Sequence, residues 1–546
     1  VIADNCAEYA NMIFNNSYEY SGSTSTVSRM WMRSMTDSSI QKAWDDRKSS
    51  SQYDTLADAA RSRAEADWLI GMNGSRAATL RLRSRGQKGS ISVGRVQTPT
   101  LAMLVDKELE VLSHIPSPYW ELEADLSQDE AAWKAKWRRT SKGENPQTHI
   151  VEQNELDTLQ AELKSGKIEV VMTKKERTER SPLNFDLTTL QKVANQMWNM
   201  SARETLDHAQ QLYERYKLTT YPRTDSQHLP KDMRGDVDEI LNKLQSQALW
   251  AAHSKRLTDG SLEHVDRNLN DSKVSDHHAI IPTGKVPPAD IGARTMQVYE
   301  LIVGRFIASF HPNAKWEDEK RKASLGEGAL HAEANVLLVE GWRKVINKAA
   351  KMPDGWGSVA AKAVSDVDSI QVDEGVTKPK PRLKEAGLLS RMENAGREVE
   401  DDELKAVMKD KGLGTPATRA ETIEKLIAKG LVQRLKGGSL RATPDGIRLV
   451  DVLRHIPVDW ITSPELTGEM ESQLRLVENG DEKASEYMKE IVSKVEELVE
   501  RFTSFTKEGL FEDSEPLGEC KRCSSPIIEL DQRYACSSDS CDVVYW

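Results

Sequence analysis

The alternation of helical and strand-like stretches is the feature that most limits how this chain can fold. Apolar residues recur at helix spacing from about residue 37 to 116, alternate with polar ones in "YWELEADLS" and "KIEVVMTKK", and return to helix spacing after residue 183. A second strand-like stretch, "ALHAEANVLLVEGW", precedes a third helical one. Because the chain has 546 residues, a single hydrophobic core is too small for it. We therefore expect a multi-domain α+β protein whose chain leaves a domain and later returns to it.

Changes of texture, several of them marked by prolines, divide the chain into segments. The predicted segments are an αβ unit (1–36), a helical part (37–116), a β-rich part (117–182), a second helical part (183–290), a second β-rich part (291–383), a third helical part with a winged-helix-like unit (384–510) and a cysteine-rich tail (511–546). Ser201 and Glu204 predict a capping box that opens a helix reaching about Arg215. Gly437 and Gly438 predict the turn of a hairpin in "LVQRLKGGSLRAT".

The overall composition is that of a globular protein, with 38% hydrophobic and 29% charged residues. No window of the sequence approaches the roughly 18 apolar residues of a membrane-spanning helix. Five cysteines in this length argue against a disulfide scaffold and for a reducing compartment, so we expect a cytoplasmic protein with no membrane partner. Most of the 13 tryptophans, such as Trp68 and Trp198, are expected in the core.

The distribution of charge points to a polyanionic partner, although the formal net charge is −11. Between residues 61 and 100, eight Lys and Arg are opposed by two acidic residues, which leaves +6 on this stretch. Acidic residues are concentrated elsewhere, as in "EIVSKVEELVE". A basic lining with an acidic exterior fits both facts and is compatible with binding to phosphates.

The stretch "KLTTYPRTDS" combines an oxygen nucleophile with a cation suited to phosphate. A phenol has a pKa near 10, so Tyr221 needs a stabilised anion to act as a nucleophile. Side chains two apart in an extended chain face the same way, which brings Arg223 beside Tyr221. Thr224 and Ser226 add hydroxyl donors suited to a phosphodiester. The pattern predicts attack of tyrosine on a phosphate; the alternative is a packed tyrosine beside a surface arginine.

Two further stretches carry polar groups that suit DNA. In "SDHHAIIPT", His277 heads an adjacent pair of histidines that could hydrogen-bond a phosphate, although such pairs are also common structural features. In "ISVGRVQTPTL", Gly94 permits close backbone approach, and Arg95 and Gln97 offer donors to a DNA backbone or base. This second stretch is not a P-loop, because Arg95-Val96 stands where Lys-Ser/Thr is required. ATP is therefore not the expected energy source.

Four cysteines near the end of the chain have the make-up of a structural zinc site. Cys520 and Cys523 are separated by two residues, and Cys536 and Cys541 by four. Four thiolates complete a tetrahedral zinc shell, and the intervening "SSPIIELDQRYA" can form the hairpin of a zinc ribbon. The alternative is a set of unligated or redox-active cysteines.

Together these segments resemble the type IA DNA topoisomerases, and most closely the bacterial topoisomerase III branch. The resemblance extends over nearly the whole chain, through "VSRMWMRSMT", "SRAEADWLIGMNGSRAATL", "SVGRVQTPTL", "PLNFDLTTLQKVAN", "TTYPRTDS", "SDHHAIIPT" and "GLGTPATRAETIEKLI" in the order of that family. It implies a toroidal core with a largely helical body, a β-rich hinge domain and a helical tyrosine-bearing domain. It also implies transient cleavage of one DNA strand, passage of another strand and religation without ATP.

The resemblance assigns roles by position. Tyr221 matches the nucleophile that becomes linked to the 5′ phosphate of the cut strand, Arg223 the arginine that positions the scissile phosphate, and His277 the histidine that supports cleavage. The expected DNA contacts are at Arg76, Ser92, Gly94, Arg95, Gln97, Thr224 and Ser226. The expected partners are single-stranded DNA and negatively supercoiled or catenated DNA, bound by a monomer associated with the bacterial nucleoid or a plasmid.

One departure from the family concerns its Toprim domain, which carries a glutamate general acid and an Asp-x-Asp site for Mg²⁺. In the family these residues lie just before the segment that "VIADNCAEYA" resembles, so we expect the Mg²⁺ site upstream of Val1. The resemblance thus implies that residues 1–36 are the end of Toprim and that this polypeptide alone has little activity. A non-catalytic DNA-binding paralogue that has lost Toprim, and a tyrosine recombinase that links to the 3′ phosphate, are the alternatives.

Overall fold

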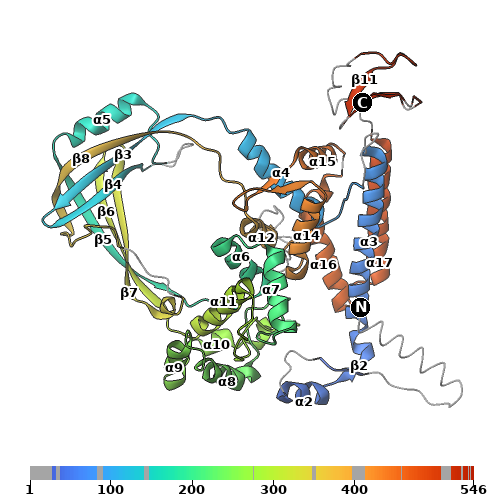
Figure 1. Ribbon diagram of the computed structural model, residues 1–546, viewed down its shortest axis with the longest axis horizontal. Coiled ribbons are helices and arrows are strands. Elements are labelled where there is room, and N and C mark those ends of the chain that lie inside the picture. Colours follow the sequence, from blue (N-terminus) through green and yellow to red (C-terminus); the bar gives the residue numbers. More distant parts are fainter. Residues whose placement is uncertain are drawn as a thin grey trace. The chain divides into compact units, whose positions relative to one another are not determined.

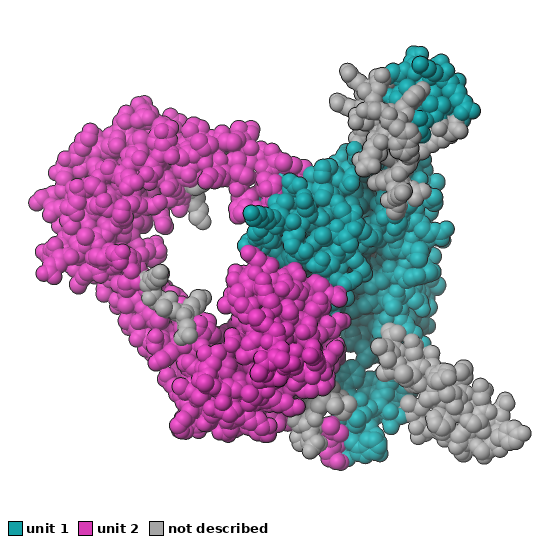
Figure 2. All heavy atoms as spheres, in the orientation of Figure 1, with its two compact units in different colours: residues 1–31, 42–108, 383–546 teal, residues 32–41, 109–382 magenta. Residues whose placement is uncertain are grey.

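The computed structural model describes residues 28–31, 37–82, 90–140, 147–274, 276–346, 352–395, 412–456, 458–505, 518–530, 533–538, 540–541 and 543–545. The chain forms two compact units of mixed helix and sheet (Figure 2). Unit 1 comprises residues 1–31, 42–108 and 383–546, and unit 2 comprises residues 32–41 and 109–382. Both units are discontinuous, which confirms that the chain leaves one region and returns to it. The seven segment boundaries stay a prediction, and of residues 1–36 only 28–31 are described.

Unit 1 is built around the long helix α3, Asp54–Leu82 (Figure 1). Its buried face repeats at helix spacing and carries mostly small side chains: Ala59, Ser62, Ala66, Ile70, Gly74 and Ala78. This face packs against α16 (Glu465–Asn479) and α17 (Ala484–Ser504). A Cβ on Gly74 would lie 3.1 Å from Leu498 of α17, so the small residue allows the two helices their close approach.

Trp68 lies outside this core, contrary to the expectation from its helix. Its side chain is 61% exposed. Residue 68 is two positions from both Ala66 and Ile70, which at about 100° per residue puts it on the opposite side of α3 from the buried stripe. Trp198 is partly buried and does pack against a core.

The remaining elements of unit 1 are short helices and ribbons. Gly437 and Gly438 both have positive φ (94° and 85°) and form the predicted turn between β9 and β10. The bounds of these elements are β1 Ser28–Arg29, α2 Asp37–Asp45 (shared with unit 2), β2 Lys48–Ser49, α4 Gln97–Leu112 (shared with unit 2), α12 Glu385–Glu393, α14 Pro416–Ala428, β9 Val432–Arg434, β10 Leu440–Ala442, α15 Pro444–His455, β11 Ile527–Leu530, β12 Arg533–Cys536 and β13 Val544–Tyr545. Among the described residues, no helix has both the length and the apolar character that crossing a bilayer requires.

The strands of unit 2 close into a six-stranded barrel in the order β3-β4-β7-β6-β5-β8, with all neighbours antiparallel. Alternate residues of each strand point into a core, as in β4, where Ala131, Trp133, Ala135 and Trp137 are buried. The bounds are β3 Pro118–Gln128, β4 Ala131–Arg139, β5 Lys167–Glu179, β6 Ala314–Leu325, β7 Gly328–Val339 and β8 Lys362–Val376. Helix α5, Gln153–Leu163, packs Leu156, Leu159 and Leu163 into the same core. Both strand-like stretches of the sequence are thus confirmed.

The second part of unit 2 is helical and has its own hydrophobic core between residues 185 and 345. It contains α6 Leu187–Trp198, α7 Ala202–Glu214, α8 Arg234–Leu244, α9 Ala251–Asp259, α10 Val265–Asn268 and α11 Ala293–Ser309. The predicted helix start is confirmed, because the Ser201 hydroxyl accepts a hydrogen bond from the Glu204 N–H at 3.0 Å. The segments that join these helices carry the residues singled out from the sequence.

Candidate functional site

The segment that carries Tyr221 lies alongside the "HAIIPT" segment. The Thr220 N–H donates to the Ile281 carbonyl at 2.9 Å, and the Thr283 N–H donates to the Leu218 carbonyl at 2.9 Å. The Thr220 hydroxyl also donates to the Ala279 carbonyl at 3.0 Å. These bonds hold Tyr221 next to the histidine pair, although about 60 residues separate the two segments in sequence.

A third stretch, "PLNFD", joins the same cluster at the start of α6. The Ile280 N–H donates to the Phe185 carbonyl at 2.8 Å, and the Leu187 N–H donates to the Thr224 carbonyl at 3.1 Å. Asp186 caps α6 by accepting from the Thr189 N–H. Three of the stretches noted in the sequence therefore meet at one place in unit 2.

The ring of Tyr221 is half-buried between two other rings. Its centroid lies 4.5 Å from that of His277, with the planes at 50°, and 5.4 Å from that of Tyr213, edge to face. The ammonium of Lys217 lies 5.4 Å from the centre of the Tyr213 ring. The phenol that the sequence singled out is thus held by aromatic contacts on two sides.

Arg223 lies on the exposed side of the same segment. Residues 221–226 lie outside any strand ladder, and their burial alternates: Pro222, Thr224 and Ser226 are buried, while Arg223 is exposed. Within the described part of the chain, no carboxylate forms an ion pair with Arg223. The expected alternation is present, and the Arg223 guanidinium is available to an anion beside Tyr221.

The hydroxyls of Thr224 and Ser226 do not have the role expected of them. Both side chains are buried, with 3% of each residue exposed. Thr224 donates to the His277 carbonyl at 2.8 Å, and Ser226 donates to the Lys273 carbonyl at 2.8 Å. Their hydroxyl hydrogens are therefore used to fasten the tyrosine segment to the histidine segment, so the expected hydrogen bonds to DNA are replaced by structural ones.

The two histidines differ in environment. His277 is exposed, whereas His278 is half-buried with Nδ1 2.9 Å from the Ala279 carbonyl oxygen. Burial, and to a smaller extent the neighbouring His277, lower the pKa of His278. His277 is the member of the pair that faces solvent and the Tyr221 ring.

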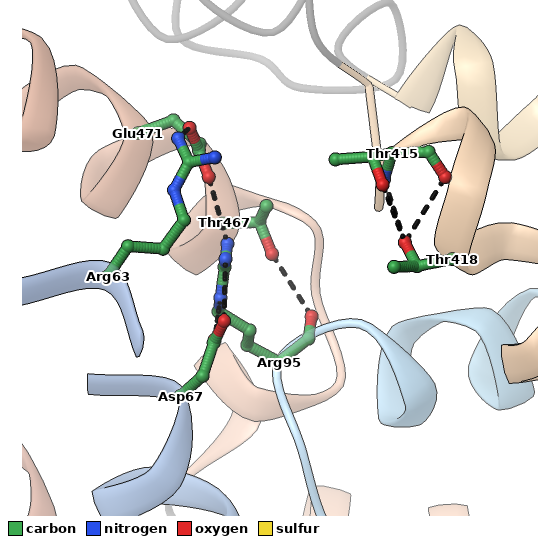
Figure 3. A network of polar contacts seen from close by, with 7 residues as sticks. All are labelled: Arg63, Asp67, Arg95, Thr415, Thr418, Thr467 and Glu471. Carbon is green, nitrogen blue, oxygen red and sulfur yellow. Dashed lines mark hydrogen bonds and ion pairs between the residues drawn. The ribbon is translucent and has the colours of Figure 1, made fainter. Parts of the chain in front are cut away.

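Arg95 lies in a buried ion-pair network of unit 1 and not on its surface (Figure 3). Its guanidinium pairs with Asp67 of α3 on one side and with Glu471 of α16 on the other, at 3.2 Å from Nη1 to Oε1. Arg63 pairs with the second oxygen of Glu471, and the Thr467 hydroxyl donates to the Arg95 carbonyl at 3.0 Å. The network joins three segments of the chain, the farthest of them 408 residues apart in sequence.

The charges of this network compensate one another. Burial acts to lower the pKa of Arg95, but the hydrogen bond and charge of Asp67, together with the charge of Glu471, hold it above its ordinary value. The neighbouring Tyr487 is buried, which raises its pKa. Arg95 was expected to contact DNA; with 9% of its side chain exposed and both neighbours acidic, it instead holds unit 1 together.

The other expected DNA contacts of unit 1 differ in exposure. Ser92 and Gln97 are half-buried and hydrogen-bonded to each other at 3.3 Å. Among the described residues, no neighbouring atom lies within 4 Å of a Cβ placed on Gly94, so a ligand could approach the backbone there. Arg76 is exposed and, within the described part of the chain, has no ion-pair partner. Arg76 is thus the cation among the expected contacts that is free to meet a phosphate.

The stretch "GLGTPATRAE" also packs against this region. A Cβ on Gly414 would lie 3.1 Å from the Val96 side chain, and φ of Gly414 is +69°, a conformation that favours glycine. Thr415 begins α14, and its N–H donates to the Thr418 hydroxyl at 3.0 Å (Figure 3). Signature stretches far apart in sequence therefore come together in unit 1 as they do in unit 2.

Removal of the Glu471 carboxylate is expected to destabilise unit 1. Glu471→Ala removes the partner that Arg95 and Arg63 share. Because Arg95 keeps its pair with Asp67 and Arg63 is partly exposed, the cost should be about 1.5–3 kcal/mol of unfolding free energy, the contribution of hydrogen bonds to a charged group. Urea unfolding of the protein measures this. Asp58→Ala, which breaks the exposed Arg61–Asp58 pair, is the control and should change the free energy by less than about 1 kcal/mol. Equal effects of the two substitutions would contradict the assignment.

A family model described as DNA topoisomerase matches residues 51–489. The chain belongs to the DNA topoisomerase family. It is similar to the DNA topoisomerase 3 of Bacillus licheniformis, with 32% identity over 97% of this chain and 72% of the relative. It is also similar to the DNA topoisomerase 3 of Bacillus subtilis, with 30% identity over 97% of this chain and 72% of the relative. These similarities identify a type IA topoisomerase close to topoisomerase III, an enzyme of the isomerase class.

The fold agrees with this assignment. The structure of this topoisomerase is similar to that of full-length topoisomerase I from Thermotoga maritima, with a TM-score of 0.66 over 95% of this chain and 80% of that chain. The sequence identity of that pair is 21%, so the comparison concerns the fold.

The four cysteines of the tail of this topoisomerase form one cluster. The sulfurs of Cys520, Cys523, Cys536 and Cys541 all lie within 4.8 Å of one another. The distance is 3.8 Å between Cys520 and Cys541 and 3.3 Å between Cys523 and Cys536. A tetrahedral site with Zn–S bonds of about 2.3 Å spaces its sulfurs by about 3.8 Å. The cluster and the predicted β11–β12 hairpin are compatible with a zinc ribbon.

Tyr213 and Lys217 were not singled out from the sequence of this topoisomerase. Tyr213 lies near the end of α7, and Lys217 follows in a left-handed conformation with φ of 55°. They lie eight and four residues before Tyr221, and these spacings did not point to a contact because the chain turns between α7 and Tyr221. The positive φ at Lys217 gave no signal in the sequence, since glycine or asparagine is the usual mark of such a position.

Loss of the Tyr213 ring is expected to slow DNA cleavage. Tyr213→Leu removes the edge-to-face contact with Tyr221, and such contacts contribute about 0.5–1.5 kcal/mol. Formation of cleaved DNA should fall about 2- to 10-fold, whereas Tyr213→Phe, which keeps the ring, should retain it. The measurement is the initial rate of oligonucleotide cleavage. A phenylalanine variant as slow as the leucine one would mean that the hydroxyl, not the ring, matters.

Proposed function

We propose that this topoisomerase cuts one DNA strand through a covalent bond to Tyr221, passes another strand through the gap and reseals the cut. The phenolic oxygen of Tyr221 loses its proton and forms a bond to phosphorus. The bond from phosphorus to the 3′ oxygen breaks, and that oxygen leaves as a hydroxyl. The product is a 5′-phosphotyrosine, and the reverse reaction restores the strand. One phosphodiester is exchanged for another, so no ATP is needed.

The convergence of three distant stretches on one phenol is the observation that carries this proposal. Tyr221 is half-exposed, His277 is in ring contact with it, and Arg223 is exposed without an ion-pair partner among the described residues. A guanidinium offers paired donors that match two phosphate oxygens, and its charge favours the phenolate. His277 could donate to the same phosphate as charge develops. Arg76, Ser92, Gly94 and Gln97 remain candidates for DNA contact in unit 1.

The four cysteines fit Zn²⁺, and we propose that they hold it as a structural ion. Among the described residues, the four cysteines are the group of three or more side chains that could hold a metal ion. No such group among these residues corresponds to the expected Mg²⁺ site. We therefore derive no step of the reaction through Mg²⁺, and its site stays a prediction. The toroidal arrangement, the domain boundaries, the monomeric state and the cytoplasmic location also stay predictions.

The proposed substrate is DNA, because the relatives are DNA topoisomerases. Single-stranded DNA, and negatively supercoiled or catenated duplex with single-stranded regions, are the forms that this chemistry requires. The cut strand must be free of its partner for another strand to pass.

The end of DNA that becomes attached to protein tests the proposal. The full-length gene product is mixed with a single-stranded oligonucleotide labelled at either end and is quenched with detergent. A 3′ label should move with the protein, and a 5′ label should appear in a shorter free fragment. Attachment of the 5′-labelled piece would instead indicate a recombinase-like link to the 3′ phosphate. Binding without any adduct would indicate a non-catalytic DNA-binding paralogue.

A further inference from the structure

The barrel of unit 2 has a polar hollow on its outer face that the proposed reaction does not use. The hollow has a volume of about 610 Å³ and is lined by outward-facing residues of β4, β5, β6 and β7. The lining residues within these strands are Arg138, Arg139, Glu169, Val171, Thr173, Lys320, Lys322, Ser324, His331 and Glu333. Inward-facing neighbours of the same strands fill the barrel core, so the hollow is separate from that core.

The ion pairs of the hollow leave a surplus of positive charge. Two lining residues pair with groups outside it: Arg139 with Glu155, and Glu169 with Lys362.

Of the charges that remain, Arg138 and Lys320 share the single carboxylate of Glu333, at 4.0 and 3.6 Å. Lys322 is exposed and has no ion-pair partner within the described part of the chain. Three cations therefore face one anion.

His331 lies in the middle of this surplus. Across the ladder it is opposite Lys322 of β6 on one side and Lys136 of β4 on the other. Burial lowers the pKa of His331, and the charges of Arg138, Lys322 and Lys320 lower it further against the opposing effect of Glu333. Arg138, Lys320 and Lys322 carry like charges around this hollow, so an anion bound here would offset their mutual repulsion.

We infer that this hollow binds phosphate groups of a DNA backbone, through Arg138 and Lys322 with His331 between them. The inference rests on the proposed function for its choice of DNA as the source of phosphate. Hydroxyl groups of Thr173 and Ser324 line the same hollow and could donate to further phosphate oxygens. The site is distinct from the Tyr221 cluster, since it is built on the barrel strands and the cluster on the segments around α6 and α7.

The salt dependence of DNA binding tests the inference. Binding of a duplex and of a single strand is measured by fluorescence anisotropy between about 50 and 200 mM salt. Each lost phosphate contact lowers the slope of log K against log salt by about 0.9 for duplex and about 0.7 for single strands. The Arg138→Gln/Lys322→Gln double variant should lose about one to two contacts and bind several-fold more weakly at about 0.1 M salt. A loss with only one form of DNA identifies that form as the source of the phosphate.

Lys134→Gln is the matched control, because Lys134 lies on the same barrel but already pairs with Glu123 and Asp125. An unchanged slope in the double variant, or an equal change in the control, would overturn the inference.

A second readout uses inorganic phosphate. Phosphate should raise the pKa of His331, measured by NMR and assigned with His331→Gln, and it should not do so in the double variant. The adduct assay with unsubstituted protein decides the proposed function separately, so the two can fail independently.

Discussion

Tyr221→Phe is expected to abolish the covalent protein–DNA adduct and to lower DNA relaxation by a factor on the order of 10⁴ or more. Phenylalanine keeps the ring that contacts His277 and Tyr213, so the segment should keep its fold. The substitution removes only the oxygen that would bond to phosphorus. The measurements are trapping of the adduct by detergent and relaxation of a negatively supercoiled plasmid, both with the full-length gene product.

Tyr216→Phe provides the matched control for this experiment. It removes a phenolic oxygen from the same stretch of chain, five residues before the candidate nucleophile. Adduct formation should be unchanged in this variant. If Tyr221→Phe still yields adducts at the rate of the unsubstituted protein, another residue is the nucleophile and the proposed function loses its central group.

Cys536→Ser is expected to remove the metal from the tail and to unfold the ribbon. The four sulfurs lie at the spacing of a tetrahedral zinc site, and binding of Zn²⁺ by such sites contributes about 10–16 kcal/mol to folding. Elemental analysis should find about one Zn²⁺ per chain in the native protein and almost none in the variant. Protease should then cleave the tail while the helices and the barrel stay protected.

The fifth cysteine supplies the control. Cys6→Ser removes a thiol outside the described residues and should leave the zinc content unchanged. The proposed zinc site would be wrong if native protein contains no zinc or if the four cysteines form disulfides. Either result would support the alternative of unligated or redox-active thiols.

Local patterns of the sequence were sufficient to predict the structural features that depend on neighbouring residues. Gly437 and Gly438 predicted a turn because both positions need positive φ, and Ser201 with Glu204 predicted a helix start because a hydroxyl three residues away can satisfy an amide. Around Tyr221 the sequence predicted an alternation of side chains, and the burial of residues 222–226 does alternate, with Arg223 exposed. The spacing of the cysteines was enough to predict one cluster, since two short pairs joined by a hairpin can meet only in a small number of ways.

Residue type alone does not show how a side chain is used where its partner is distant in sequence. Arg95 has the chemistry of a phosphate contact, but Glu471, 376 residues later, makes it a buried ion pair. Thr224 has a hydroxyl suited to a phosphodiester, but the His277 carbonyl accepts its hydrogen. Trp68 is a large apolar residue on a helix, yet the stripe of α3 that meets α16 and α17 lies on the other side.

The sequence by itself determined the family, the order of helices and strands, the candidate nucleophile and the cysteine cluster. Each of these follows from residues close together or from motifs in a fixed order. Only the tertiary structure decided which polar side chains are free to meet DNA and which are used internally. It also revealed the cationic surplus around His331, whose charges come from three strands of one barrel. The physical reason is that a charged group or a hydroxyl can bind a ligand only if no other group of the folded protein already pairs with it. Folding decides this, because it brings together residues that are far apart in the sequence.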